Sequence, residues 1–111
     1  RILNIHPSLL PLFPGLNTHQ RAIDAGMKVA GCTVHFVTEG MDEGPVIAQA
    51  VVPVLIDDTA ETLAGRVLTV EHQTYAAALK LVASGSVSMR ADGSVERLTS
   101  GTDAEARLIS A

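Results

Sequence analysis

The chain has 111 residues, 47% of them hydrophobic, and a formal net charge of −4. This length allows one domain with a buried core, but it is short for a complete enzyme that acts on two substrates. The acidic balance, the scattered lysines and arginines and the scarcity of aromatic residues argue against nucleic-acid binding, which needs clustered positive charge and stacking surfaces.

The sequence shows no sign of a membrane or secretory segment. No apolar run approaches the roughly 20 residues of a spanning helix, and no signal-peptide pattern opens the chain. The single cysteine, Cys32, cannot form an internal disulfide, and its apolar neighbours indicate a small buried side chain rather than a nucleophile. These features predict a cytoplasmic protein.

The first predicted element is a strand that ends at His6. Asn4 and His6 are two residues apart, so in a strand both side chains project from the same face. Pro7 lacks the amide hydrogen that a sheet needs, so the chain must leave the sheet there. Because ligands bind at strand ends in open α/β sheets, Asn4 and His6 are candidate functional residues. The alternative is a buried polar pair that only satisfies its own hydrogen bonds.

A rigid loop and a short helix are predicted next. Residues 8–16 place prolines and a glycine among bulky apolar side chains, a pattern typical of a loop packed on the core. Asn17 or Thr18 would cap the helix, with Gln20 in capping-box register and Gly26 as its C-terminal stop.

Two apolar, β-branched segments, 29–37 and 46–54, predict strands that pair antiparallel. The loop between them, 38–45, contains three carboxylates and two glycines, more than a plain turn requires. It is a candidate functional loop, with a solvated acidic turn as the alternative.

The longest predicted helix runs to about Ser84, and Gly85 ends it. Asp58 and Glu61 have the spacing of a capping box at its start. One face of this helix carries Leu63, Val67, Val70, Ala78 and Val82.

The chain therefore divides into a main part and two small ones. Residues 1–85 would form the principal unit, 86–98 a small hairpin and 99–111 a polar tail that is weakly patterned and prone to fraying.

The sequence excludes several common kinds of catalytic site. The histidine and cysteine spacings fit no zinc site, and neither a nucleophile elbow nor a glycine-rich phosphate loop occurs. What remains is Asn4, His6 and a carboxylate of the acidic loop. An asparagine amide can stabilise a developing oxyanion, an interaction worth about 3 kcal/mol. A histidine kept protonated by a carboxylate can donate to the same oxygen, so the set suits acyl transfer.

Two long motifs carry a resemblance to a known family. The stretches NIHPSLLPLFPGLNTHQRAI and GCTVHFVTEGMDEGPVIAQ, followed by VEHQTYAAAL, resemble phosphoribosylglycinamide formyltransferases, the folate-dependent enzymes of purine synthesis. The likeness covers residues 2–84. It implies an α/β, Rossmann-like three-layer fold with a mixed sheet, of which this chain is the C-terminal portion.

The resemblance also implies roles for individual residues. Asn4, His6 and Asp42 stand at the positions of the family's catalytic trio. The pocket for the folate pteridine would be lined by Thr38, Glu39, Gly40, Met41 and Asp42. The residues near the nucleotide substrate would be Ser8, Gly15 and His35, although a structural role for His35 is equally compatible with its place on a strand. Asn17 stands where relatives often have histidine, so no proton transfer is assigned there.

By this resemblance the parent protein transfers the formyl group of 10-formyltetrahydrofolate to the amine of glycinamide ribonucleotide, through a tetrahedral intermediate and without a metal. The family's N-terminal half, with its glycine-rich phosphate loop, has no counterpart here. We therefore expect the chain to need that missing half or a partner chain, a homodimer being one form. The alternatives are another folate-dependent formyltransferase, a formyltetrahydrofolate hydrolase, or a folate-binding or interaction domain without catalysis.

Overall fold

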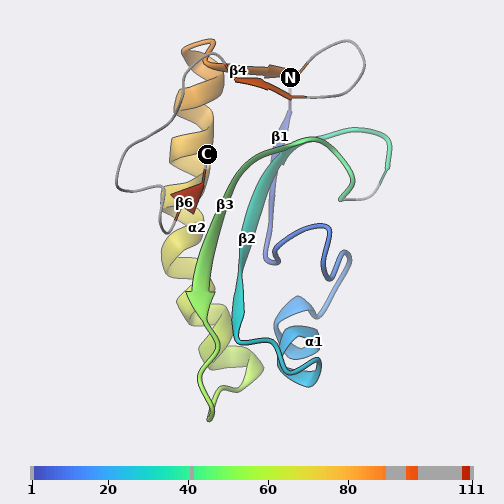
Figure 1. Cartoon of the computed structure of the whole chain (residues 1–111), viewed down its shortest axis with the longest axis vertical. Coiled ribbons are helices and arrows are strands. Elements are labelled where there is room, and N and C mark those ends of the chain that lie inside the picture. The colour runs from blue at the N-terminus through green and yellow to red at the C-terminus, as the bar shows by residue number, and fades with distance from the viewer. Residues whose placement is uncertain (1, 41, 90–94, 98–108, 111) are drawn as a thin grey trace.

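A computed structural model describes residues 2–40, 42–89, 95–97 and 109–110. The chain forms an α/β fold in which a curved sheet runs beside one long helix, with a short helix at one end of the sheet (Figure 1). In chain order the elements are β1 (Leu3–His6), α1 (Thr18–Asp24), β2 (Val29–Phe36), β3 (Val46–Pro53), α2 (Ala60–Ala83), β4 (Val87–Met89), β5 (Val95–Arg97) and β6 (Ile109–Ser110).

The main sheet has the strand order β1-β2-β3-β6, and every pairing between its described strands is antiparallel. The predicted pairing of the strands at 29–37 and 46–54 is thereby confirmed. β6 comes from the segment predicted to be a frayed tail, yet its two residues pair with β3, while residues 99–108 and 111 lie outside the described part. A parallel strand, which a mixed sheet would contain, is not among the strands described.

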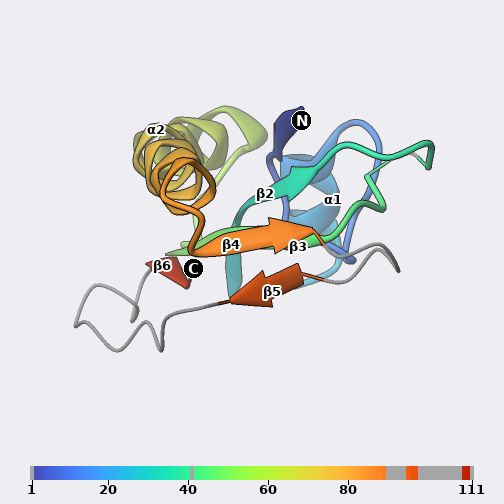
Figure 2. The same ribbon diagram turned by 90° about the horizontal axis from the view of Figure 1, so that it is seen from above.

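The predicted hairpin is also present. β4 and β5 pair antiparallel in a separate two-stranded sheet, and Figure 2 shows it lying beside the end of α2. The expected turn of this hairpin, residues 91–94, lies outside the described residues.

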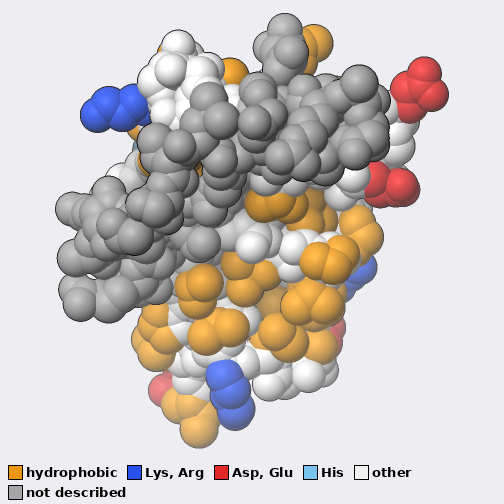
Figure 3. Space-filling model, turned by 45° about the horizontal axis from the view of Figure 1, so that its top comes forward, with side chains coloured by type: hydrophobic (Ala, Val, Ile, Leu, Met, Phe, Trp, Pro, Cys, Tyr) orange, Lys and Arg blue, Asp and Glu red, His pale blue; other side chains and the backbone are white. Residues whose placement is uncertain are grey.

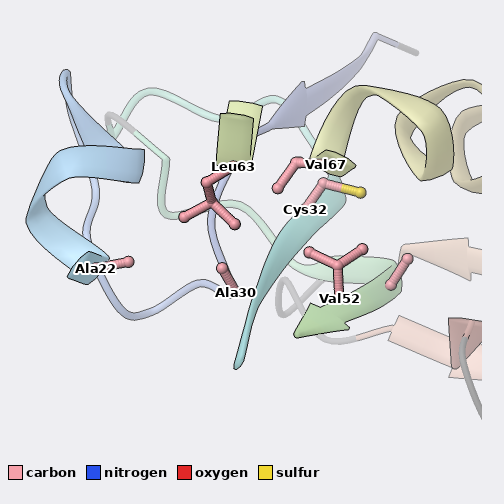
Figure 4. Packing of buried hydrophobic residues seen from close by; sticks show 7 residues of the cluster. Ala22, Ala30, Cys32, Val52, Leu63 and Val67 are labelled. Atoms are coloured by element: carbon pink, nitrogen blue, oxygen red, sulfur yellow. The ribbon is translucent and has the colours of Figure 1, made fainter. Parts of the chain in front are cut away.

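One face of the main sheet packs against α2 and forms the core. Cys32 and Val52 of the sheet meet Leu63 and Val67 of α2, and Ala22 of α1 closes the end of the same cluster (Figure 4). Leu63 and Val67 were predicted to lie on the packed face of this helix, and both are fully buried. Burial of such side chains is the main stabilising contribution to folding.

The opposite face of the sheet carries the loop between β1 and α1. The hydroxyl of Thr33, in the middle of β2, donates to the carbonyl of Ser8 at 2.7 Å and accepts the N–H of Leu10 at 3.0 Å. Gln49 of β3 donates both to this hydroxyl and to the Leu10 carbonyl. These buried hydrogen bonds confirm the prediction of a loop fastened to the core, because each polar group of the anchor finds a partner.

The start of α1 differs from its prediction. Asn17 is the N-cap, but it adopts the left-handed conformation with φ +57° and its side chain caps nothing. Gln20 instead donates to Asp24 within the helix, at 2.8 Å. The predicted capping box is therefore wrong, because a side-chain cap requires an extended backbone at the cap residue. Gly26, at φ +74°, follows the helix as expected.

The start of α2 lies one residue later than its prediction. Thr59 is the N-cap, and it forms a capping box with Thr62 rather than the predicted Asp58 with Glu61. The Asp58 carboxylate instead forms a bidentate ion pair with the Arg66 guanidinium, with N–O distances of 2.7 and 2.9 Å. The end of α2 is as predicted, with Gly85 at φ +78° just beyond it.

Several large hydrophobic side chains remain on the surface. Ile2, beside the edge strand β1, is 69% exposed, and Leu16, Leu55 and Ile56 are exposed as well. Figure 3 shows hydrophobic side chains gathered over much of one face. Such surface is typical of a region that contacts another segment or chain. Among the described helices, none combines the length and the apolar character needed to cross a membrane.

Candidate active site

His6 and Asp42 come together at the end of β1. Nδ1 of His6 lies 3.4 Å from Oδ1 of Asp42, and their side chains are 8% and 10% exposed. The two residues belong to different motifs of the sequence, the strand end before Pro7 and the acidic loop. The structure thus unites two of the three residues that the sequence singled out.

The backbone fixes the Asp42 carboxylate in place. Asp42 has φ +55°, a conformation that asparagine and aspartate tolerate better than most residues. Its second oxygen, Oδ2, accepts the backbone N–H of Gly15 at 2.9 Å. One oxygen therefore faces the histidine while the other is held by the loop after β1.

Both nitrogens of the His6 ring face oxygen atoms. Nε2 lies 3.1 Å from the carbonyl oxygen of Phe13, and Nδ1 faces the Asp42 carboxylate. Carbonyl and carboxylate oxygens only accept hydrogen bonds, so a ring that carries a proton on each nitrogen can donate in both directions. This environment suits a histidine that works as a proton donor.

Asn4 lies on the same strand face as His6. Asn4 pairs with His35 across the sheet and His6 pairs with Thr33, so all four side chains are on the side covered by the loop. Asn4 is exposed whereas His6 is buried. The strand therefore presents an open amide and a buried imidazole on the same face.

The two ring nitrogens of His35 differ in their hydrogen bonding. Nδ1 lies 3.0 Å from the carbonyl oxygen of Phe36, so it carries the proton. Nε2 is buried and has no hydrogen-bond partner among the described residues, and His35 as a whole is only 3% exposed. A buried acceptor without a partner is costly, so a ligand that donates a hydrogen bond would stabilise it.

The other predicted site residues are distributed as follows. Ser8 is buried and its hydroxyl donates to the carbonyl of Leu12 at 2.6 Å. Thr38 and Glu39 are exposed and Gly40 is half-buried, while Met41 lies outside the described residues.

A groove of about 440 Å³ opens beside Asp42. Its walls are formed by Leu10, Pro11, Pro14, Asp42, Glu43, Gly44 and Val46. The acidic loop contributes Asp42 to this groove, but Thr38, Glu39 and Gly40 are not among the described residues that line it. The apolar wall was missed by the sequence reasoning, which had assigned Leu10, Pro11 and Pro14 only to a rigid loop.

His19, in the first turn of α1, is half-buried. Desolvation lowers the pKa of His19, and the negative charge of Glu71 on α2 opposes this effect. The described residues hold no group of three or more histidine, cysteine, aspartate or glutamate side chains placed to bind a metal ion.

The comparisons with known proteins agree on one family. The family model described as "Formyl transferase" matches residues 1–79. The trifunctional purine biosynthetic protein adenosine-3 of Gallus gallus is 55% identical over 95 residues, which are 86% of this chain and 10% of that protein. The phosphoribosylglycinamide formyltransferase of Escherichia coli (strain K12) is 48% identical over 89 residues, 80% of this chain and 42% of that one.

The solved structures give the same picture. The crystal structure of glycinamide ribonucleotide transformylase 1 from Symbiobacterium toebii superposes with a TM-score of 0.84 at 56% identity, covering 89% of this chain and 46% of that one. The chain thus spans less than half of each of these relatives.

Proposed function

The chain belongs to the formyl transferase family, and from that premise we propose that its protein transfers a formyl group from 10-formyltetrahydrofolate to the primary amine of glycinamide ribonucleotide. The observation that carries this proposal is the His6–Asp42 pair, held at the end of β1 beside an open groove. The names of the similar proteins from E. coli and S. toebii support this acceptor.

The proposed reaction is a direct acyl transfer. The amine nitrogen of the acceptor bonds to the formyl carbon while the carbonyl electron pair moves onto oxygen, giving a tetrahedral intermediate. That intermediate collapses when its bond to N10 of the folate breaks. Asn4 and protonated His6 would donate to the oxyanion, with Nε2 of His6 exchanging its present acceptor, the Phe13 carbonyl, for the substrate oxygen.

Asp42 would perform two tasks in this scheme. Its Oδ1 stabilises the protonated His6 ring across 3.4 Å. It would also accept, through a water molecule, the proton that the attacking amine must lose, and that proton would return to the departing N10. Because the Gly15 N–H holds the carboxylate in place, Asp42 needs little rearrangement to perform both tasks.

The groove and the residues around the His6–Asp42 pair would hold the two substrates. The apolar groove beside Asp42 suits a flat heteroaromatic ring, and we assign the folate pteridine to the acidic loop and this groove. Nε2 of His35 would accept a hydrogen bond from a substrate N–H or O–H group. Ser8 and Gly15 would lie toward the nucleotide, and the nucleotide phosphate would be held by residues outside this chain.

More than half of each similar protein is unmatched by this chain, and we propose that activity needs that complement. β1 is an edge strand among the described residues, and Ile2 beside it is exposed. A segment covering this edge would complete the sheet. The chain alone should therefore bind folate weakly and transfer little formyl group, compared with the full-length protein.

The test compares Asp42→Asn with Glu43→Gln in the full-length protein. Glu43 is the adjacent exposed carboxylate and lines the same groove, which makes it a matched control. Asp42→Asn should lower kcat by about 10²- to 10⁴-fold. Glu43→Gln is expected to affect the KM for the folate, because Glu43 lines the groove, but it should leave kcat within about twofold.

The acceptor is identified by supplying glycinamide ribonucleotide, formylatable tRNA or water alone. Formyl transfer to the ribonucleotide supports the proposal. Transfer to tRNA, or release of formate in water alone, would instead favour one of the related activities. Near-normal turnover of Asp42→Asn would refute the mechanism.

A further inference from the structure

The side chain of Arg21, in α1, lies against the loop that holds both members of the His6–Asp42 pair. Its Nη1 donates to the carbonyl oxygens of Pro14 and Leu16, the second at 3.0 Å. The guanidinium carbon lies 5.5 Å from the centre of the Phe13 ring, within the range of a cation–π contact. One arginine thus contacts three residues of the loop on either side of Gly15.

The contact with Pro14 reaches Asp42 through a single peptide group. The Pro14 carbonyl and the Gly15 N–H belong to the same planar amide, whose oxygen accepts from Arg21 and whose N–H donates to Asp42 at 2.9 Å. Hydrogen bonds in such a chain polarise one another, so a cation on the oxygen makes the N–H a stronger donor.

The contact with Phe13 reaches His6 in a similar way. The ring of Phe13 packs on the guanidinium, and the carbonyl of the same residue faces Nε2 of His6 at 3.1 Å. Arg21 therefore contacts the Phe13 side chain and the Pro14–Gly15 peptide group, which between them supply both backbone partners of the pair.

We propose that Arg21 is a positioning residue for the reaction, which orients the Asp42 carboxylate and the His6 ring through the backbone of residues 13–16. This inference depends on the proposed roles of His6 and Asp42. Arg21 touches no reacting atom. The planar guanidinium can bridge two carbonyls with fixed geometry, which a lysine ammonium does less well.

The variants are Arg21→Gln, Arg21→Lys and Lys28→Gln. The first removes the charge and the bridge, and the second keeps the charge with a poorer bridge. The third is the matched control, because Lys28 is an exposed cation close after α1, and its backbone carbonyl accepts the N–H of Val54, which follows β3 and is not part of the 13–16 loop. Thermal melting first verifies that each variant is folded.

The first readout needs no activity. In NMR spectra, the amide proton of Gly15 reports the strength of its hydrogen bond to Asp42. Arg21→Gln should move this proton upfield, Arg21→Lys should move it less, and Lys28→Gln should leave it in place. An unchanged Gly15 amide in a folded Arg21→Gln variant would overturn the proposal, and should that variant fail to fold, an unchanged amide in Arg21→Lys would do so.

The second readout is kinetic and uses the full-length protein. Arg21→Gln should lower kcat by about tenfold with KM changed less than about twofold, and Arg21→Lys should recover part of the loss. In an Asp42→Asn background the same change should cost clearly less, because the route from Arg21 through Gly15 to Asp42 is already lost and only the route through Phe13 to His6 remains. Equal losses in both backgrounds would overturn the proposal. If the full-length protein transfers no formyl group, the proposed function fails, while the Gly15 amide still decides the role of Arg21.

Discussion

The backbone of Gly44 lies directly against the carbonyl oxygen of Phe36. A Cβ atom built on Gly44 would stand 1.6 Å from that oxygen and 3.3 Å from Nδ1 of His35. No side chain fits in this space. Gly44 is two residues from Asp42, so this close approach sets where the acidic loop returns to the sheet.

Gly44→Ala should therefore displace the acidic loop and separate Asp42 from His6. We expect formyl transfer by the full-length protein to fall by about 100-fold, the scale of a catalytic group moved by about an ångström. The matched control is Gly65→Ala in α2, where an added methyl group meets nothing within 4 Å. That change should stabilise the helix by up to about 1 kcal/mol without loss of activity. Full activity in Gly44→Ala would show that the loop position does not matter.

The buried hydroxyl of Thr33 anchors the loop after β1, and its removal tests that anchor. Thr33→Val keeps the shape of the side chain but leaves the Leu10 N–H and the Ser8 carbonyl without their partner. The free energy of unfolding should fall by about 1–3 kcal/mol in urea titrations. Thr69→Val, on the exposed face of α2, should change it by less than about 0.5 kcal/mol. Similar midpoints for the two variants would contradict this account.

The sequence predicts the strand carrying Asn4 and His6 well, because alternation and a following proline are direct consequences of strand geometry. The unusually acidic loop also indicates a functional carboxylate, and the family resemblance selects Asp42 among the three. It cannot indicate the Phe13 carbonyl or the Gly15 N–H as partners of the pair. These are backbone groups, which every residue has, and only the path of the folded loop selects them.

The helix starts show a second limit of sequence reasoning. Asp58 and Thr59 are both good capping residues, and the local pattern does not choose between them. The choice is made by Arg66, about two helical turns inside α2, which binds the Asp58 carboxylate and leaves the cap to Thr59. At Asn17 the left-handed backbone, set by the loop before it, removes the predicted cap.

The lowered pKa of His19 should make the free energy of unfolding depend on pH. Burial holds the pKa of His19 below its ordinary value of 6.5, so the folded chain binds fewer protons than the unfolded chain. Stability should be complete above this value and should decline as the pH falls below it. Urea midpoints at about pH 7.5 and about pH 5.5 bracket this range. His19→Gln should reduce the difference between the two midpoints, whereas His72→Gln, at an exposed position of α2, should not; equal differences would exclude His19 as the cause.

The ion pair at the start of α2 acts in a lower pH range. Hydrogen bonds from Arg66 hold the pKa of Asp58 well below its ordinary value of 3.8, so its stabilising contribution is present above that value and is lost only in stronger acid. Asp58→Asn should lower the urea midpoint at neutral pH and flatten the acid limb of the stability curve. Asp57→Asn, at the exposed neighbouring position, provides the comparison. A neutral-pH midpoint equal to that of Asp57→Asn would show that the pair adds nothing.

The pairing of β1 with β2 has a consequence for how this chain tolerates insertions and deletions. In the observed register His6 stands opposite Thr33, while Leu3 stands opposite Phe36 and packs toward α2. Loss of one residue from β1 would exchange the two sets of side chains. The histidine would then point into the hydrophobic core, and a leucine would point toward the loop that covers the other face. Loops around the site can change length residue by residue, but this strand can change only in steps of two. The alternation of side chains along this four-residue strand thus determines which of its residues reach the site.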